Sequence, residues 1–120
     1  EMLDAVSTYR GRGLRGVFHA YAGDIDMARK LMRCGEFVFG IAGVVTFKNG
    51  GLGDVVESLP VEFMLLETDC PYLTPVPYRG KRNESAYVKY VRDKIAQIKH
   101  IEPERVAAVT SATAKQIFCI

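Results

Sequence analysis

The chain has 120 residues, of which 48% are apolar and 25% are charged, and its formal net charge is +2. This composition is typical of one small globular domain and excludes disordered and fibrous proteins. The charge is too small to indicate a nucleic-acid partner by itself, and no run of about 18 apolar residues is present to cross a membrane. Three cysteines fit no zinc or disulfide spacing, so we expect a reducing compartment and a cytoplasmic location.

The first half of the chain predicts a helix followed by two strand–helix units. Apolar residues at helical spacing predict a helix over residues 1–9. Because the chain starts inside this pattern, we expect it to be a piece of a longer protein. Short apolar runs predict strands at 16–20 and 37–42, with Asp24 as the N-cap of the helix between them. Residues 49–59 predict only a weak helix, because glycines interrupt it.

The second half begins with a strand and continues with a proline-containing loop and helices. Residues 62–68 predict a strand buried on both faces, because Val61 and the four residues from Phe63 to Leu66 are apolar. A loop over 74–83 precedes an amphipathic helix that ends near residue 100. A proline at a first helical position then predicts a short helix over 103–109, and a hydroxyl residue at 110 or 111 predicts the cap of a separate last helix.

This alternation of strands and helices predicts a parallel α/β sheet built of right-handed crossover units. Three strands are few for such a sheet, since both edge strands would be apolar and unpaired, which soluble proteins avoid. We therefore expect residues 1–120 to form a single piece of a larger α/β barrel.

Two carboxylates, Glu67 and Asp69, end the third predicted strand, in the segment LLETDCPYL. Acids at the carboxyl end of such a strand lie where α/β proteins place their chemistry. With period-two alternation, Leu65, Glu67 and Asp69 point to the same side. Asp69 is therefore a candidate metal ligand or general base. An aspartate that only caps the next turn is an equally good interpretation of this segment alone.

Four segments, taken in order, resemble the motifs of one family. GVFHAYAG at 16–23 is similar to G-V-F-H-C-F-S-G, and GVVTFKN at 43–49 is similar to G-I-V-T-F-K-N. LLETDCPYL at 65–73 resembles L-L-E-T-D-A-P-Y-L, and PYRGKRNE at 77–84 resembles P-H-R-G-K-R-N-E. These motifs mark the TatD family of metal-dependent deoxyribonucleases, and the resemblance covers essentially the whole chain. Alanines replace the family's Cys and Ser in the first motif.

The resemblance implies the C-terminal portion of a TIM-type (β/α)8 barrel of roughly 260 residues, with three parallel strands and flanking helices in this chain. It implies a hydrolase that acts on DNA phosphodiester bonds and uses divalent ions of the magnesium or zinc type. The family's other metal ligands lie on earlier strands that cannot be mapped here. Two protein ligands cannot close a zinc site, so we expect the fragment alone to be inactive and to hold no ion by itself.

The resemblance also implies roles for individual side chains. His19 and Asp69 would be metal ligands, and Asp69 would also accept the proton of the attacking water. Taken alone, a histidine such as His19 is more often packed or hydrogen-bonded. Glu67 is expected to lie behind the ligands, or to pair with a buried basic neighbour. We expect the side chains of His19 and Asp69 to converge within about 12 Å, because they end two strands that flank a third.

Basic residues lie in two loops at the carboxyl ends of the predicted strands. Arg79, Lys81 and Arg82 follow the third strand, and Lys48 follows the second. Charge runs are usually solvated surfaces. Their place on the side that would hold the metal nevertheless makes them candidates for contact with substrate phosphates.

Aromatic residues near the same end offer a second kind of contact. Tyr21, Tyr72 and Tyr78 are candidates for stacking on the bases of a DNA or nucleotide substrate. Packing within the core or the loops is the alternative interpretation for each of them.

The strand edges predict a protein partner. An excised three-stranded piece would leave unpaired edges at 16–20 and 62–68, and a bare inward face built from Val17, Val38 or Phe39, and Leu65. We therefore expect self-association, or pairing with the missing N-terminal part of the barrel. Two other hypotheses stay open: a non-catalytic folding or assembly fragment, and a related barrel hydrolase that acts on amide or ester bonds.

Overall fold

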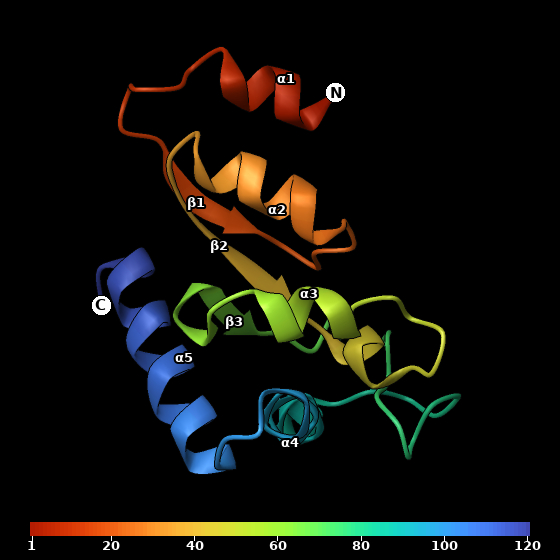
Figure 1. The fold of residues 1–120 in the computed structure, drawn as a ribbon. Coiled ribbons are helices and arrows are strands. Elements are labelled where there is room, and N and C mark those ends of the chain that lie inside the picture. The colour runs from red at the N-terminus through yellow and green to blue at the C-terminus, as the bar shows by residue number, and fades with distance from the viewer.

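A computed structural model describes all 120 residues, with helices packed around a three-stranded parallel sheet (Figure 1). The strand order is β1–β2–β3, so consecutive strands are neighbours, and the predicted α/β arrangement is confirmed. The strands are β1 (Arg15–Phe18), β2 (Glu36–Ile41) and β3 (Met64–Leu66). The helices are α1 (Met2–Ser7), α2 (Ile25–Met32), α3 (Gly53–Ser58), α4 (Val88–Lys99) and α5 (Pro103–Phe118).

The central strand β2 pairs along both of its edges. Gly40 lies opposite Leu65 of β3, which sets the register of the second pair. Side chains alternate along a strand, and Phe39, Ile41 and Met64 are fully buried in one core with α2, α3 and α4. This burial explains the continuous apolar runs in the sequence. It also leaves the alternate positions of the strands to face the other side of the sheet.

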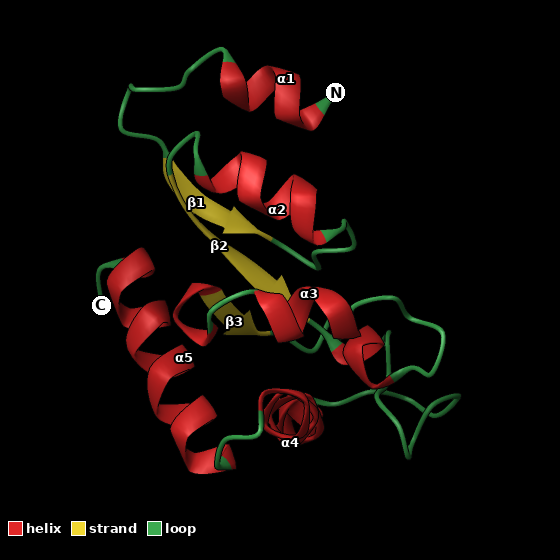
Figure 2. Cartoon of the chain, viewed as in Figure 1, coloured by secondary structure: helices red, strands yellow, loops and turns green.

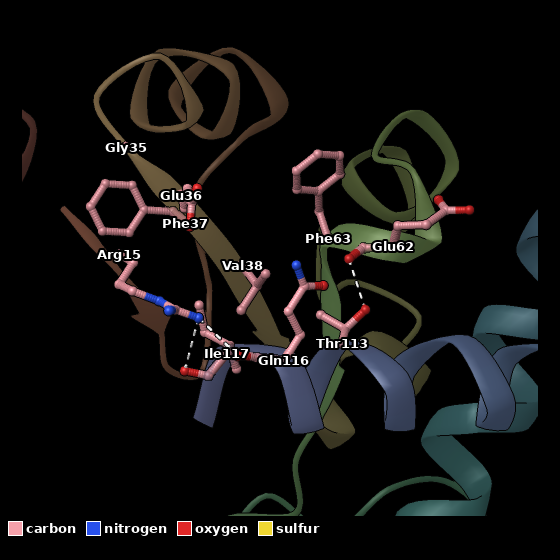
Figure 3. Close-up of a pocket in the computed structure, with 10 residues that line it drawn as sticks. All are labelled: Arg15, Gly35, Glu36, Phe37, Val38, Glu62, Phe63, Thr113, Gln116 and Ile117. Atoms are coloured by element: carbon pink, nitrogen blue, oxygen red, sulfur yellow. Dashed lines mark hydrogen bonds between the residues drawn. The ribbon is translucent and has the colours of Figure 1, made fainter. Parts of the chain in front are cut away.

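Helix α5 crosses that other side near the amino ends of the strands (Figure 3). The Arg15 guanidinium donates to the carbonyl of Gln116 at 2.8 Å, and the Thr113 hydroxyl donates to the carbonyl of Glu62 at 2.9 Å. A cavity of about 270 Å³ remains between the helix and the strands. These contacts tie the last helix to residues that lie far away in the sequence.

The inward face of the sheet is therefore less open than expected. Val38 and Leu65 retain only 8% and 6% of their accessible surface, and residues of α5 lie beside both of them. Phe39, the alternative to Val38, points into the core on the helix side. The prediction of a bare face is therefore wrong at Val38 and Leu65, because the last helix of the same chain lies beside them, whereas Val17 is only half-buried and lines an open groove.

Several boundaries of the observed helices and strands, which Figure 2 colours red and yellow, differ from the predicted ones. The third strand is limited to Met64–Leu66, because a turn of 3-10 helix occupies Val61–Phe63 and Asp69 has a left-handed backbone with φ of 53°. The other predicted elements at 1–9, 16–20, 37–42 and 49–59 are observed as Met2–Ser7, Arg15–Phe18, Glu36–Ile41 and Gly53–Ser58.

The two predicted C-terminal helices are one helix. Thr110 lies in the middle of α5 instead of capping a separate helix. Its side chain is buried, and its hydroxyl donates to the carbonyl of Val106 one turn earlier at 2.8 Å. A threonine hydroxyl that bonds backward in this way is satisfied inside a helix, so the cap prediction was wrong. None of the helices in the structure has the length and apolarity needed to span a bilayer.

Candidate metal centre

His19 is placed by the turn that follows β1. The next residue, Ala20, has a left-handed backbone with φ of 45°, which turns the chain away from the strand direction. Two backbone groups fix this turn: the Ala20 N–H donates to the Glu67 carboxylate at 2.8 Å, and the Tyr21 N–H donates to the Gly40 carbonyl at 2.9 Å. The histidine side chain is thereby held at the carboxyl end of the sheet.

The two acids are placed by the end of β3 and the loop after it. The Glu67 N–H still bonds to β2 at 3.0 Å, so the ladder extends one residue past the strand. The chain then turns at Asp69. Buried Asn83 returns to the start of this loop and donates to the carbonyls of Thr68 and Tyr72, both at 2.6 Å. Asn83 belongs to the PYRGKRNE segment, but no pattern in the sequence distinguishes it from its neighbours.

The three side chains meet at one point. His19 Nδ1 lies 3.0 Å from Glu67 Oε1, and His19 Nε2 lies 3.0 Å from Asp69 Oδ1. The imidazole side chain is 64% exposed, whereas the Glu67 and Asp69 side chains are 16% and 28% exposed. The predicted convergence of His19 and Asp69 is confirmed. The cluster is partly buried on the acid side and open to solvent on the histidine side.

Glu67 governs the electrostatics of the cluster. Its hydrogen bond and its charge, followed by the charge of Asp69, raise the pKa of His19 above the ordinary value. The alternative prediction, that a buried basic neighbour is the partner of Glu67, is wrong. The partner is instead His19, which is mostly exposed, and Glu67 lies behind it as the other interpretation predicted.

Gly40 makes room for this carboxylate. A Cβ atom at position 40 would collide with the carboxyl group of Glu67, which lies directly over the β2 backbone. A glycine inside an otherwise apolar strand often marks a close approach of this kind. The glycine in FVFGIA was therefore the sequence signal for a group packed against β2, although the identity of that group could not be read from it.

The geometry fits two ligands of a divalent ion. Nitrogen and oxygen ligands bind zinc at about 2.0–2.2 Å, which places two ligands of one ion about 3.0–3.5 Å apart, and Nε2 and Oδ1 have such a separation. A ligand histidine normally donates its other N–H to a carboxylate or carbonyl, and here Glu67 is positioned to accept it. No group of three or more His, Cys, Asp or Glu side chains could hold an ion in this chain. His19 and Asp69 thus form an incomplete ligand set.

The predicted basic residues lie outside this cluster. Lys48, Arg79, Lys81 and Arg82 are exposed, and none forms a salt bridge. The Arg79 guanidinium stacks on the ring of Phe47, 3.8 Å from the ring centroid. Arg79 and Lys48 are therefore brought to the same neighbourhood, although they follow different strands. Their contact with substrate stays a prediction.

The three candidate tyrosines have different environments. Tyr21 is buried and its hydroxyl donates to the carbonyl of Asp24 at 2.6 Å, so it packs in the core and cannot stack on a base. Tyr72 is 75% exposed. Tyr78 is 39% exposed and stacks on Tyr87, a residue that the sequence reasoning missed.

The sequence model of TatD-related DNases matches residues 1–119. The chain belongs to this family. An uncharacterized metal-dependent hydrolase of Bacillus subtilis is 44% identical over 106 residues, which are 88% of this chain and 41% of that protein. A similarly named protein of Escherichia coli K12 is 40% identical over 106 residues, 88% of this chain and 40% of that protein. This TatD-family chain thus spans about two fifths of the length of these curated relatives.

Solved structures show the same fold. A TatD homolog from Escherichia coli superposes with a TM-score of 0.79 at 23% identity, over 88% of this chain and 40% of that one. A TatD family hydrolase from Entamoeba histolytica superposes with a TM-score of 0.78 at 20% identity, over 97% and 45%. The predicted fold class, a three-stranded portion of the TatD-type barrel, is confirmed by these superpositions.

Proposed function

We propose that this TatD-family chain supplies two metal ligands and the general base of a hydrolase that cleaves DNA phosphodiester bonds. The observation that carries the proposal is the contact of His19 with Glu67 and Asp69 at the carboxyl ends of β1 and β3. This is the end of the strands at which TIM-type barrels hold their active sites. The family name supports DNA as the substrate, and the names of the relatives support a divalent metal ion.

Each side chain of the cluster has a separate task in this proposal. A divalent ion supplies Lewis acidity, which polarises a phosphoryl oxygen and makes water a better nucleophile. Glu67 accepts the Nδ1–H of His19, so that Nε2 is the atom available as a ligand. Asp69 contacts His19 through one carboxylate oxygen. Its other oxygen is available to accept the proton of the attacking water.

The remaining ligands must come from outside this chain. A groove of about 610 Å³ with a mainly apolar lining lies beside β1 and includes Val17 and His19. A second groove of about 430 Å³ lies beside β3 and includes Leu65 and Glu67. Each groove joins an unpaired strand edge to a member of the cluster. We propose that further parallel strands of the barrel occupy both edges and bring the missing ligands, and that the chain self-associates when those strands are absent.

The test compares full-length protein with the 120-residue chain on a labelled DNA oligonucleotide, with Mg²⁺, Mn²⁺ or Zn²⁺ added. We expect cleavage by the full-length protein that a chelator abolishes, and negligible cleavage by the 120-residue chain, because two ligands do not complete the site. Small esters and amides serve as the alternative substrates. Faster turnover of those compounds than of DNA would replace the nuclease with a related barrel hydrolase.

Sedimentation of the 120-residue chain at micromolar concentration tests the pairing of its edges. We expect a dimer, or a complex when a polypeptide with the remaining strands is added, since open edges and apolar grooves favour pairing. A well-folded chain that stays monomeric in both experiments would contradict the proposed completion of the sheet.

A further inference from the structure

Asn83 lies where the long loop after β3 ends and the chain enters α4. It comes shortly before the turn of 3-10 helix at Ser85–Tyr87, which leads directly into that helix. Helix α4 is anchored in the core by Val91 and Ile95, which are 1% and 0% exposed. Asn83 itself retains only 2% of its accessible surface. A buried polar side chain beside a well-packed helix is placed to hold a second segment in position.

Every hydrogen-bonding group of the Asn83 side chain has a partner. Nδ2 donates to the carbonyls of Thr68 and Tyr72, both at 2.6 Å, and Oδ1 accepts the Glu84 N–H at 2.9 Å. The main-chain N–H of Asn83 donates to the Pro71 carbonyl at 3.0 Å. A carbonyl only accepts and a main-chain N–H only donates, so these partners fix which end of the amide faces which neighbour. One residue thus bonds to three carbonyls of the segment 68–72.

Asp69 lies inside the segment that these bonds hold. Thr68 precedes it, and the Tyr72 N–H donates back to the Asp69 carbonyl at 2.9 Å, which closes a turn. The Asp69 backbone is left-handed, with φ of 53°, a conformation that residues other than glycine adopt at a cost in energy. Because one planar amide holds the carbonyls on both sides of this turn, the backbone that carries the Asp69 carboxylate has little freedom to move.

The other two members of the metal centre are held by the sheet instead. The Ala20 N–H, next to His19, donates to the Glu67 carboxylate, and the Glu67 N–H donates to the Ile41 carbonyl of β2. Asp69 comes after this last bond of the ladder. The 3.0 Å separation of Asp69 Oδ1 from His19 Nε2 therefore depends on where the loop places Asp69.

We propose that Asn83 is a positioning residue of the metal centre, which sets the separation of Asp69 Oδ1 from His19 Nε2 by bridging the Thr68 and Tyr72 carbonyls. Its hydrogen bonds go to the loop and to Glu84, so it acts on the ligands only through the backbone of Asp69. The site requires a group that donates twice and accepts once. An ionised aspartate has no donor and a serine has one. The inference rests on the proposed function and deepens it.

The test is a calorimetric titration of the full-length protein with Zn²⁺, and in a second series with Mn²⁺, in the absence of DNA. Asn83→Leu keeps the approximate volume of the side chain but removes both donors. We expect its metal affinity to fall about tenfold, the lower end of the 10- to 100-fold range for groups that orient metal ligands. Asn83→Ser retains one donor and should show a smaller loss. It carries the test if the leucine variant does not fold.

Thr74 provides a matched control in the same loop. It is 5% exposed, and its hydroxyl donates to the Lys81 carbonyl at 2.5 Å, outside the segment 68–72. Thr74→Val removes that bond while keeping the shape of the side chain. We expect the melting temperature to fall in both Thr74→Val and Asn83→Leu, since each loses buried hydrogen bonding. Metal affinity should fall only in Asn83→Leu, whereas a residue that merely stabilised the loop would affect both measurements alike at both positions.

The kinetics of DNA cleavage at saturating metal give a second readout. A displaced Asp69 lowers turnover, and a shift of about 1 Å in a catalytic group can cost up to about 100-fold. We expect kcat to fall at least fivefold in Asn83→Leu. The KM for DNA should stay at the wild-type value, because Asn83 is buried and its bonds are to the loop. A loss that appears only in KM would contradict the positioning role.

Wild-type metal affinity in folded Asn83→Leu or Asn83→Ser would overturn the proposal, and so would an equal loss of affinity in Thr74→Val. The titrations do not involve DNA. If the Asn83 variants lose metal affinity while the full-length wild type fails to cleave DNA, the positioning role stands and the proposed function is wrong. If the wild type cleaves DNA and the Asn83 variants bind metal as it does, only the positioning role is wrong.

Discussion

The two ends of the sheet use polar side chains in different ways. At the amino ends, Arg15 and Thr113 donate to backbone carbonyls and so hold α5 against the strands (Figure 3). At the carboxyl ends, the His19 side chain contacts two carboxylates and is 64% exposed, and one of those carboxylates, Glu67, also accepts the Ala20 N–H. The polar side chains at the amino ends bond mainly to main-chain groups, whereas those at the carboxyl ends also form a cluster of ionisable side chains that is open to solvent and available for chemistry. This division between ends is the one seen in TIM-type barrels.

The largest effect is expected from Asp69→Asn at the carboxyl end. The amide retains the shape of the side chain but cannot accept the proton and is a poorer metal ligand, so we expect the rate of DNA cleavage by full-length protein to fall about 10³-fold. Its side chain is 28% exposed, and the melting temperature should change little. Single-turnover kinetics measure the effect, and a loss smaller than tenfold would remove Asp69 from the proposed chemistry.

A smaller effect is expected from Gly40→Ala, which acts on the cluster through Glu67. The added Cβ would meet the end of the Glu67 side chain, a group that can rotate away, so His19 would lose its support. We expect metal affinity to fall about 10- to 100-fold, as for other partners of ligand histidines. Calorimetric titration of the full-length protein with metal measures this change.

Gly53→Ala is the matched control for that substitution. Gly53 begins α3, and nothing lies within 4 Å of its added Cβ. The control should bind metal as the wild type does. An equal loss of metal affinity in both variants would show that the support of His19 by Glu67 is not what Gly40 protects.

A substitution at the amino ends of the strands is expected to change the stability of the protein and not its rate of DNA cleavage. Thr113→Val removes the donor to the Glu62 carbonyl from a side chain that is 9% exposed. We expect the free energy of unfolding to fall by about 1 kcal/mol, the usual net value of such a hydrogen bond, with the cleavage rate unchanged. Urea titration and steady-state kinetics of one preparation measure both. A tenfold loss of rate without loss of stability would break the proposed division between the two ends.

The smallest expected effect is a dependence of the free energy of unfolding on pH. The pKa of His19 is raised by the hydrogen bond and charge of Glu67. A raised folded-state pKa contributes stability that is fully present below the unfolded value of about 6.5 and is lost as the pH rises through the folded-state value. Since the imidazole is 64% exposed, we expect less than about 1 kcal/mol. In the metal-free state, the wild type should be more stable than Glu67→Gln below neutral pH, and this difference in free energy of unfolding should disappear as the pH rises through neutrality. Denaturant titration of both proteins at several pH values measures it. A difference in free energy of unfolding that does not change with pH would contradict this prediction.

The sequence by itself determined the order of the elements and the two candidate ligands. Apolar runs and helical spacing are local patterns, and they located all three strands. Parallel strands bring their carboxyl ends to one edge of a sheet, so residues that follow different strands meet there without any knowledge of the packing. For this reason the convergence of His19 and Asp69, 50 positions apart in the printed sequence, was predictable.

Only the tertiary structure decided which groups surround those ligands. Glu67 contacts His19 because Gly40 leaves space above β2. Tyr21 is not available to bind a substrate, because it is buried and its hydroxyl donates to the Asp24 carbonyl. The single helix α5 crosses the inward face that the strands alone would have left bare. Such contacts depend on the shapes of segments that are distant in sequence. Local periodicity fixes the face on which a side chain lies, but it does not fix what that face will meet.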